Sequence, residues 1–302
     1  MSPPPTVFVV GATGTQGGAV ARQLRGLGWN VRATTRKLDS DRARALTDAG
    51  VQLTQADWDD GEALAASMAG CDKLFLVLVV NPKDPDSERR HALRILDTAK
   101  QAGLGQVVSC TSLGVSRVGP ELEAASPVLH HLLSIKKTVE QAIADAGLDS
   151  YTLLRPAYLM ANFVEPAINA YSDILEQGTW TTALAPESQL GLLDHEDTAR
   201  IAVAAFRDPA RFHRRVIGMA SELRTAQQTL DTLGAAMGRS LTAHFMTEEQ
   251  IAAEPPWTIT FRLNKAMRNM ADDLDLEALA EITPLTTFEA FLERERDQVN
   301  KF

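Results

Sequence analysis

The chain has few cysteines and no long apolar stretch. Cys71 and Cys110 are the two cysteines among 302 residues, and their spacing matches neither a metal-binding nor a redox motif. Residues 1–5 include no basic residue, and the apolar run after them is too short for a signal peptide. No stretch approaches the length of a membrane span. We therefore expect a cytoplasmic protein with no membrane segment, whose cysteines are reduced core residues.

An excess of positive charge is also absent. Asp and Glu number 39 against 30 Lys and Arg, which gives a net charge of -9 at pH 7. Such a chain cannot offset the phosphate charge of a nucleic acid, so we expect no nucleic-acid partner, although a local basic site is compatible with this balance. The length is sufficient for one large α/β domain or for a domain with an additional lobe.

A glycine-rich turn near the N-terminus is the first positive signal. The apolar residues 7–10 lead into Gly11, Gly14 and Gly17, and a helical pattern follows at once. Glycine lets the backbone turn tightly and approach a ligand, and at the third position it lets helix and strand come into contact. The helix start offers N–H groups and a positive dipole end to a pyrophosphate. Because the triad lies between a strand and a helix, it predicts a dinucleotide site.

Strand and helix patterns alternate along the first half of the chain. Strand patterns cover residues 7–10, 30–35, 51–56, 71–80, 105–110 and 151–155, and helical patterns cover residues 17–28, 41–50, 60–69, 87–102 and 128–146. This alternation predicts an α/β fold with a doubly wound parallel Rossmann sheet. Residues 111–127 are expected to form a loop, because they contain two glycines and two prolines as breakers.

The alternation ends after residue 156. Residues 189–193, 216–219 and 241–245 have the pattern of isolated short strands among helices. We interpret them as parts of a smaller mixed α/β C-terminal lobe that covers the cofactor face. The predicted domains are residues 1–156, which bind NAD(P), and residues 157–302, which serve a substrate or partner, with some segments returning to the Rossmann sheet.

The residues after the second strand bear on the choice of dinucleotide. Sites for NAD usually place Asp or Glu there to bind the ribose hydroxyls, but this chain has Arg36 and Lys37. Arg36 can hold a 2′-phosphate through two parallel hydrogen bonds, which favours NADP(H) over NAD(H), although nearby Asp39 weakens the argument slightly. After the third strand, Asp57 and Trp58 are placed to meet the adenine. Asp57 is equally well explained as the cap of the next helix.

These motifs resemble the NmrA-like family, the atypical branch of the short-chain dehydrogenase/reductase superfamily, over most of the chain. The residues that carry the resemblance are 11–17 (GATGTQG), Arg36, Lys136 with Glu140, 152–162 (TLLRPAYLMAN), 193–197 (LDHED) and 284–292 (PLTTFEAFL). The resemblance implies NADP(H) binding, with Lys136 on the nicotinamide ribose and residues 158–162 near the nicotinamide. The predicted cofactor contacts are Gly11, Thr13, Gly14, Thr15, Gln16, Gly17, Arg36, Lys37, Asp57, Trp58, Lys136, Tyr158 and Asn162.

The resemblance also implies two kinds of function. Some members of the family are NADPH-dependent reductases of quinones or small aromatic compounds, and others bind the nucleotide without catalysis and act as redox sensors. Typical short-chain dehydrogenases place a proton-donating Tyr four residues before the Lys, where Lys136 has Leu132. His131, or its neighbour His130, is a substitute donor, since imidazole titrates near neutral pH.

Three residues are the candidate catalytic set: Lys136, His131 and Ser112. Ser112 lies where the superfamily has an oxyanion-stabilising serine, although Thr111 competes for this role. Tyr158 is a further candidate donor, or else a wall of the pocket. Other chemistries lack their residues: no Gly-x-Ser-x-Gly occurs, and the turn at 195–197 lacks the further ligands of a metal site.

Together these features predict an NADPH-dependent reductase of a small quinone-like or aromatic acceptor. The alternative is a non-catalytic NADP(H) sensor that regulates a partner protein. A quinone can take its proton from water, so the reductase tolerates the missing Tyr. No oligomeric state is predicted.

Overall fold

The computed structural model describes residues 3–81, 83–255 and 258–299, so Met1 and Ser2 of the proline-containing lead lie outside the described residues. The chain divides into two compact units, which are described separately. The first unit comprises the residues up to Ser112, together with Ser134–Arg155 and Thr198–Ile217. The second unit comprises Leu113–Leu133, Pro156–Asp197 and the residues from Gly218 on.

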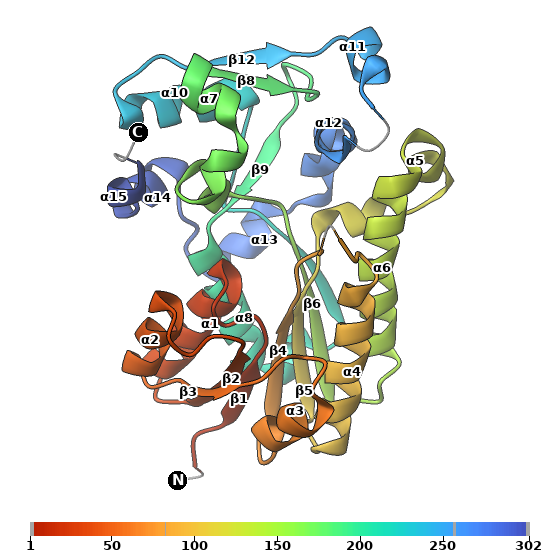
Figure 1. Cartoon of the computed structure of the whole chain (residues 1–302), viewed down its shortest axis with the longest axis vertical. Helices are drawn as coiled ribbons and strands as arrows, with labels where there is room; N and C mark the ends of the chain where they lie inside the picture. The colour runs from red at the N-terminus through yellow and green to blue at the C-terminus, as the bar shows by residue number, and fades with distance from the viewer. Residues whose placement is uncertain (1–2, 82, 256–257, 300–302) are drawn as a thin grey trace. The chain divides into compact units, whose positions relative to one another are not determined.

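The first unit is organised around a seven-stranded sheet with the order β10-β6-β5-β4-β1-β2-β3 (Figure 1). Its strands are β1 (Thr6–Val9), β2 (Asn30–Thr35), β3 (Gln52–Gln55), β4 (Lys73–Val77), β5 (Gln106–Cys110), β6 (Ser150–Pro156) and β10 (Arg215–Met219). The pairs from β3 across to β6 are parallel. The predicted doubly wound parallel sheet is therefore confirmed.

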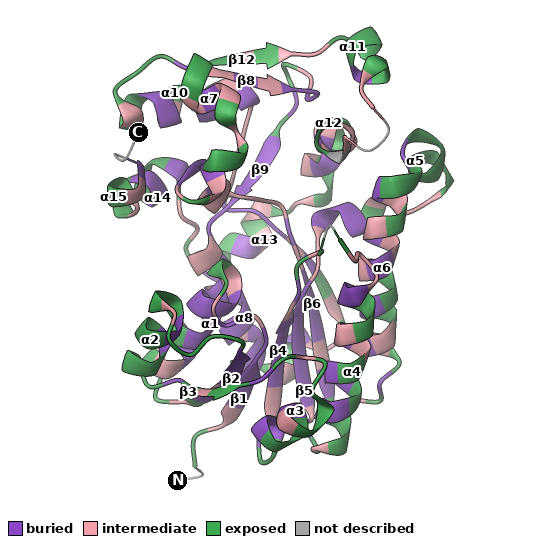
Figure 2. Cartoon of the chain, in the orientation of Figure 1, coloured by how far each residue is buried: buried purple, intermediate pink, exposed green. Residues whose placement is uncertain are grey.

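Helices lie on both faces of this sheet, as buried parallel strands require. They are α1 (Thr15–Gly26), α2 (Asp41–Asp48), α3 (Gly61–Met68), α4 (Ser87–Gln101), α6 (Pro127–Ala144), α8 (His195–Arg207) and the short α9 (Pro209–Phe212). Helices α3, α4 and α6 lie on one face, and α1, α2 and α8 on the other (Figure 1). The central strands β1, β4, β5 and β6 are mostly buried, the edge strand β3 is largely exposed, and the outer sides of the helices are exposed (Figure 2).

Apolar spacing explains how α3, α4 and α6 attach to the sheet. Leu64, Ile95 and Val139, one from each helix, share a buried cluster with Phe8 and Leu74 of the strands. All five side chains are less than a tenth exposed. Burying a side chain of this size contributes about 1.5–3 kcal/mol, so this face holds the helices by the hydrophobic effect.

The second unit contains two small sheets. One has β11 (Glu222–Arg224) antiparallel to β9 (Leu190–Leu193), which is parallel to β7 (Tyr158–Leu159), and the other pairs β8 (Thr179–Thr182) with β12 (Thr242–Phe245) in parallel. The α-helices of this unit are α5 (Pro120–Ala125), α7 (Ser172–Gln177), α10 (Ala226–Met237), α11 (Glu248–Ala253), α12 (Ile259–Ala266), α13 (Leu276–Ala280), α14 (Phe288–Arg294) and α15 (Arg296–Val299). Its 3-10 helices are η1 (Leu113–Arg117), η2 (Met160–Phe163), η3 (Ala167–Ala170) and η4 (Met267–Asp273). The expected mixed α/β character of this part is confirmed.

Two local predictions are wrong. Residues 111–127 do not form a loop throughout, because η1 and α5 occupy most of them. Pro120 occupies the first position of α5, where its missing N–H costs nothing. The strand predicted at 71–80 ends at Val77, and Val79 is 84% exposed.

The segment at 216–219 is a third correction. We expected a short strand of the C-terminal lobe, but β10 (Arg215–Met219) pairs beside β6 at the edge of the large sheet. The backbone N–H of Arg214 donates to the Tyr151 carbonyl at 2.8 Å and brings the chain to this edge. Such pairing joins residues far apart in sequence, so a local pattern cannot place the strand.

Candidate functional site

The turn after β1 requires glycine at two positions. Gly11 has φ +69°, a left-handed conformation that favours glycine. A Cβ on Gly17 would lie 2.3 Å from the Gly11 carbonyl oxygen, and a Cβ on Gly11 would lie 3.0 Å from the Val77 carbonyl oxygen. The Gly14 N–H donates to the Gly11 carbonyl at 2.8 Å and closes the turn. Helix α1 and the end of β4 therefore approach the turn too closely to leave room for a side chain at Gly17 or Gly11.

The N-terminus of α1 suits an anion. Its N-cap is Gly14, with no side-chain cap and no acidic residue in the first turn. First-turn N–H groups lack intrahelical partners and lie at the positive end of the helix dipole. The Oε1 of Gln16 is buried with no hydrogen-bond partner in the described part of the chain. Together, an uncapped helix start and an unsatisfied polar atom fit a dinucleotide, whose phosphates accept hydrogen bonds and whose hydroxyls donate them.

Arg36 and Lys37 follow β2 directly and are exposed. The Ser40 hydroxyl donates to the Lys37 carbonyl at 3.1 Å, and the Gln55 amide donates to the Arg36 carbonyl at 3.4 Å. Ser40 also caps α2 through the Ala43 N–H. These bonds hold the backbone of the bend, while the two cationic side chains extend from it.

Arg42 is a cation that the sequence reasoning missed. It belongs to α2, and its guanidinium donates to the carbonyl of Thr13, in the glycine turn, at 3.4 Å. Residue 42 is part of no motif, and its helix has the pattern of an ordinary charged surface helix. The feature of the sequence that could have identified Arg42 is its position at the start of α2, because the N-termini of such helices lie near the ligand-binding edge of the sheet.

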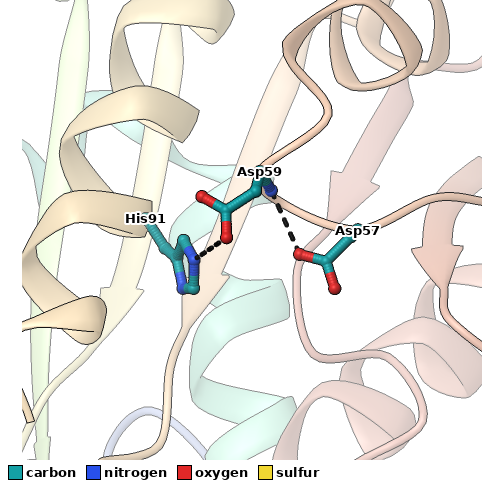
Figure 3. A group of neighbouring side chains, drawn as sticks. All are labelled: Asp57, Asp59 and His91. Atoms are coloured by element: carbon teal, nitrogen blue, oxygen red, sulfur yellow. Dashed lines mark hydrogen bonds and ion pairs between the residues drawn. The ribbon is translucent and has the colours of Figure 1, made fainter. Parts of the chain in front are cut away.

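Asp57 and Trp58 follow β3 as expected. The Asp57 carboxylate is exposed and accepts the Asp59 N–H at 3.1 Å (Figure 3). Asp60, rather than Asp57, caps α3, since its carboxylate accepts the Ala63 N–H at 3.0 Å. The capping interpretation of Asp57 is therefore wrong. Trp58 is half-buried against the core of the first unit.

The side chains of Asp57, Asp59 and His91 lie within 4.8 Å of one another, a spacing that a metal ion could use (Figure 3). Asp59, however, is already bound by His91 Nε2 at 3.2 Å and by the Arg94 guanidinium at 2.6 Å. Hydrogen bonds from His91 and Arg94 hold the pKa of Asp59 below its ordinary value. The positive charge of Arg94 disfavours a cation here, and we interpret the group as an ion-pair cluster.

Lys136 lies in α6 and makes a buried ion pair that the sequence reasoning did not foresee. Its Nζ is 2.6 Å from Oε1 of Glu88 in the first turn of α4, and the two side chains are 13% and 5% exposed. The thiol of Cys110, the last residue of β5, has a pKa raised by burial, which the charge of Lys136 partly opposes. Glu140, one turn after Lys136 in α6, binds Thr111 directly beyond β5, so Lys136 lies near the carboxyl end of β5, where ligands bind in such sheets.

One turn further along α6, Glu140 has a structural task. Its carboxylate is held by the Arg155 guanidinium at 3.0 and 2.6 Å and by the Thr111 hydroxyl at 2.5 Å. Glu140 is 5% exposed, so this network ties α6 to the ends of β5 and β6. It also engages Thr111, the competitor for the role given to Ser112. Ser112 itself is half-buried, directly beyond Thr111.

His131 is exposed on α6. Five residues of an α-helix turn about 140° past a full turn, so His131 and Lys136 lie on different sides of the helix. Leu132, one turn before Lys136, is half-buried and aliphatic. The role of His131 as a proton donor stays a prediction that this geometry does not support.

Tyr158 and Asn162 belong to the second unit. The Tyr158 hydroxyl is hydrogen-bonded to that of Tyr171, and both rings contact buried Phe163 and Trp180. Burial, with Tyr171 beside it, raises the pKa of Tyr158, and a side-chain hydrogen bond from Asn162 opposes this rise. Tyr158 is thus a neutral phenol within an aromatic cluster.

The LDHED segment anchors the C-terminal helix. Asp194 and Asp197 are 0% exposed. Arg294 of α14 binds Asp194 at 2.7 and 2.9 Å, while Asp197 accepts from the Ser221 hydroxyl at 2.5 Å and from the Thr286 N–H at 2.8 Å. Burial opposes the charge of Asp194, but the bonds from Arg294 outweigh it and hold the pKa of Asp194 below its ordinary value. This segment therefore joins α14 to the rest of the second unit.

The predicted site residues fall in both units. The first unit holds Gly11, Thr13, Gly14, Thr15, Gln16, Gly17, Arg36, Lys37, Asp57, Trp58, Ser112 and Lys136, and the second holds His131, Tyr158 and Asn162. A hollow of about 530 Å³ on the second unit is lined by α10, α14 and α15, and none of these residues lines it. Among the described residues, no helix is both long and apolar enough to cross a membrane.

Solved structures share this fold. NmrA, a negative transcriptional regulator, has a TM-score of 0.77 and 20% identity, with 97% of each chain covered. The NADPH complex of an NADPH-dependent quinone oxidoreductase from Escherichia coli has a TM-score of 0.74 and 21% identity, covering 96% of this chain and 99% of that chain.

Sequence relatives agree with the structural likeness. The uncharacterised oxidoreductase YesF of Bacillus subtilis (strain 168) is 30% identical over 233 residues, covering 77% of this chain and 71% of that protein. The NAD(P)H azoreductase of Xenophilus azovorans is 28% identical over 247 residues, covering 81% and 78%. The profile of the NmrA-like family matches residues 4–292. The chain therefore belongs to the NmrA-like family.

Proposed function

We propose that this protein binds NADP(H) at the glycine turn and reduces a small quinone-like or aromatic acceptor by hydride transfer. The observation that carries the proposal is the uncapped start of α1, where Gly17 packs against Gly11 with no room for a side chain. An azoreductase and a quinone oxidoreductase among its relatives support the reaction class.

The preference for NADP(H) over NAD(H) rests on exposed cations. Arg36 and Lys37 stand after β2, and Arg42 reaches the glycine turn. A 2′-phosphate binds a guanidinium through two charge-assisted hydrogen bonds, which are roughly twice as strong as neutral ones. The nearby carboxylate of Asp39 weakens this preference slightly, because its negative charge opposes that of the phosphate.

Binding of the nicotinamide half rests on Lys136, which donates hydrogen bonds and is held in place by Glu88. NADPH, when bound, supplies a hydride to the acceptor. A quinone that receives a hydride needs one proton to become the neutral hydroquinone. Water can supply this proton, which is consistent with Leu132 at the position of the usual tyrosine. Ser112 is the proposed hydrogen-bond donor to the oxygen that gains charge.

A second function is favoured by Leu132 and by the likeness to NmrA. A protein that binds NADP(H) without catalysis needs no proton donor, and NmrA is a transcriptional regulator. In this alternative, the nucleotide changes the affinity for a partner protein or the state of assembly.

One pair of measurements separates the two functions. Titrations with NADPH and NADH test binding, and NADPH oxidation is then followed with a panel of quinones, azo dyes and aromatic carbonyls. Binding with oxidation supports the reductase. Binding without oxidation, together with light scattering or pull-down that differs between NADP⁺-bound and free protein, supports the sensor. Absence of nucleotide binding would overturn both.

A further inference from the structure

The buried pair of Glu88 and Lys136 contains an unsatisfied oxygen. Glu88 Oε1 accepts from Lys136 Nζ at 2.6 Å, but Oε2 is buried with no hydrogen-bond partner in the described part of the chain. The Glu88 side chain is 5% exposed. Leaving a buried polar group unpaired costs about 1–3 kcal/mol, more for a charged group, so nearly all such groups have partners in native proteins. This oxygen therefore indicates a ligand.

The chemistry of the pair identifies the kind of ligand. A carboxylate only accepts hydrogen bonds, an ammonium only donates them, and a hydroxyl does both. Vicinal hydroxyls match the two groups at once, with one donating to Glu88 and one accepting from Lys136. Because the pair is neutral overall, it lacks the positive charge that would select a phosphate, unlike Arg36 and Lys37 after β2.

The position of the pair identifies which hydroxyls these are. Glu88 lies in the first turn of α4, the helix that follows β4, and Lys136 lies one turn before Glu140, whose carboxylate accepts from the Thr111 hydroxyl directly beyond β5. The glycine turn approaches the last residue of β4, Val77. The pair thus lies at the carboxyl edge of the sheet beyond the pyrophosphate turn, away from β2 and its cations. The adenine ribose, by contrast, is bound at the end of β2 in Rossmann proteins, usually by an acidic residue.

We propose that Glu88 is a direct ligand of the nicotinamide ribose, whose hydroxyl donates to its free oxygen, and that it also orients Lys136. This inference rests on the proposed function. It adds a second recognition residue to the nicotinamide half of the site and explains why a carboxylate is buried there.

The test compares two ligands that differ in one half. NADP⁺ carries the nicotinamide ribose, and 2′,5′-ADP lacks it but keeps the 2′-phosphate and adenine. We expect Glu88→Gln to raise the Kd for NADP⁺ roughly 10- to 100-fold, the usual worth of a hydrogen bond to a charged group, and to change the Kd for 2′,5′-ADP less than about twofold. Calorimetric titration measures both without turnover. Asp97→Asn, an exposed carboxylate on the same helix, is the matched control and should change neither Kd.

Each other outcome has a distinct meaning. Equal losses for both ligands would make Glu88 purely structural, and unchanged affinities would remove it from the site; either result overturns the inference. Wild-type protein that binds neither ligand would overturn the proposed function itself. If Glu88→Gln does not fold, Glu88→Asp keeps the charge with a shorter reach, and it should weaken NADP⁺ binding selectively. Equal effects of Glu88→Asp on both ligands, or none, would again overturn the inference.

Discussion

Two neighbouring cations, Arg36 and Lys37, carry the proposed preference for NADP(H). In the double variant Arg36→Ala, Lys37→Ala, we expect the Kd for NADPH to rise roughly 10- to 100-fold, because two charge-assisted contacts to the 2′-phosphate are lost. The Kd for NADH should change less than about twofold. Fluorescence titration with both cofactors measures this. Lys100→Ala, an exposed cation at the end of α4, serves as the control. An unchanged preference for NADPH would contradict the assignment.

A single histidine is expected to make the protein sensitive to mild acid. His195 is 12% exposed, and burial lowers its pKa, although the charges of Asp194 and Glu196 act in the opposite direction. The unfolded chain binds the proton at its ordinary pKa near 6.5, above the folded pKa. The contribution of neutral His195 to the free energy of unfolding is therefore fully present above about pH 6.5. As the pH falls below this value, the free energy of unfolding decreases by at most about 1.4 kcal/mol per pH unit.

Urea unfolding between pH 7 and pH 5 measures this loss. The variant His195→Gln should lose less free energy of unfolding across this range than the wild type. His244→Gln, which changes an exposed histidine of β12, should retain the wild-type dependence. Equal pH profiles for the wild type and His195→Gln would show that His195 does not titrate as described.

At the scale of the element, two glycines of α1 offer a matched pair. A Cβ on Gly17 would lie 2.3 Å from a backbone oxygen that cannot move aside, whereas a Cβ on Gly26 meets nothing within 4 Å. We expect Gly17→Ala to destabilise the protein by about 1–3 kcal/mol or more, and Gly26→Ala to stabilise it by about 0.5–1 kcal/mol. Urea midpoints measure both. Full stability of Gly17→Ala would show that the turn is not closed as described.

The elements also show which parts of the fold were predictable. Strands β1 to β6 and helices α1 to α4 and α6 follow from apolar periodicity, a property of neighbouring residues. Helix α5 was missed because its proline occupies the first helical turn, where proline is tolerated. Strand β10 was assigned to the wrong sheet because its partner β6 lies about sixty residues earlier in the chain.

At the scale of the whole molecule, the cofactor should act as a stabilising ligand. A ligand that binds only the folded state at 100 times its Kd adds about 2.7 kcal/mol to the free energy of unfolding. NADP⁺ should therefore raise the melting temperature by several degrees, and NADH at the same concentration should raise it less. Thermal scans across a concentration series measure this. Equal shifts from the two nucleotides would contradict the preference, whatever the reaction.

Membership of the NmrA-like family leaves two functions open, because one fold serves both reductases and regulators. Leu132 in the candidate site also fails to distinguish a reductase from a regulator. Its aliphatic side chain removes the usual proton donor, and a quinone substrate or a sensing role each tolerates the loss.

The sequence alone determined the parallel sheet, the glycine turn and the cations after β2, since each depends on residues adjacent in the chain. The tertiary structure decided what those residues contact. Glu88 is an unremarkable helix residue in the sequence, and only folding places it 2.6 Å from Lys136, 48 residues away. Folding likewise brings Arg42 to the carbonyl of Thr13 and pairs Glu140 with Arg155. Burial and pairing arise between distant segments, and no local pattern contains them.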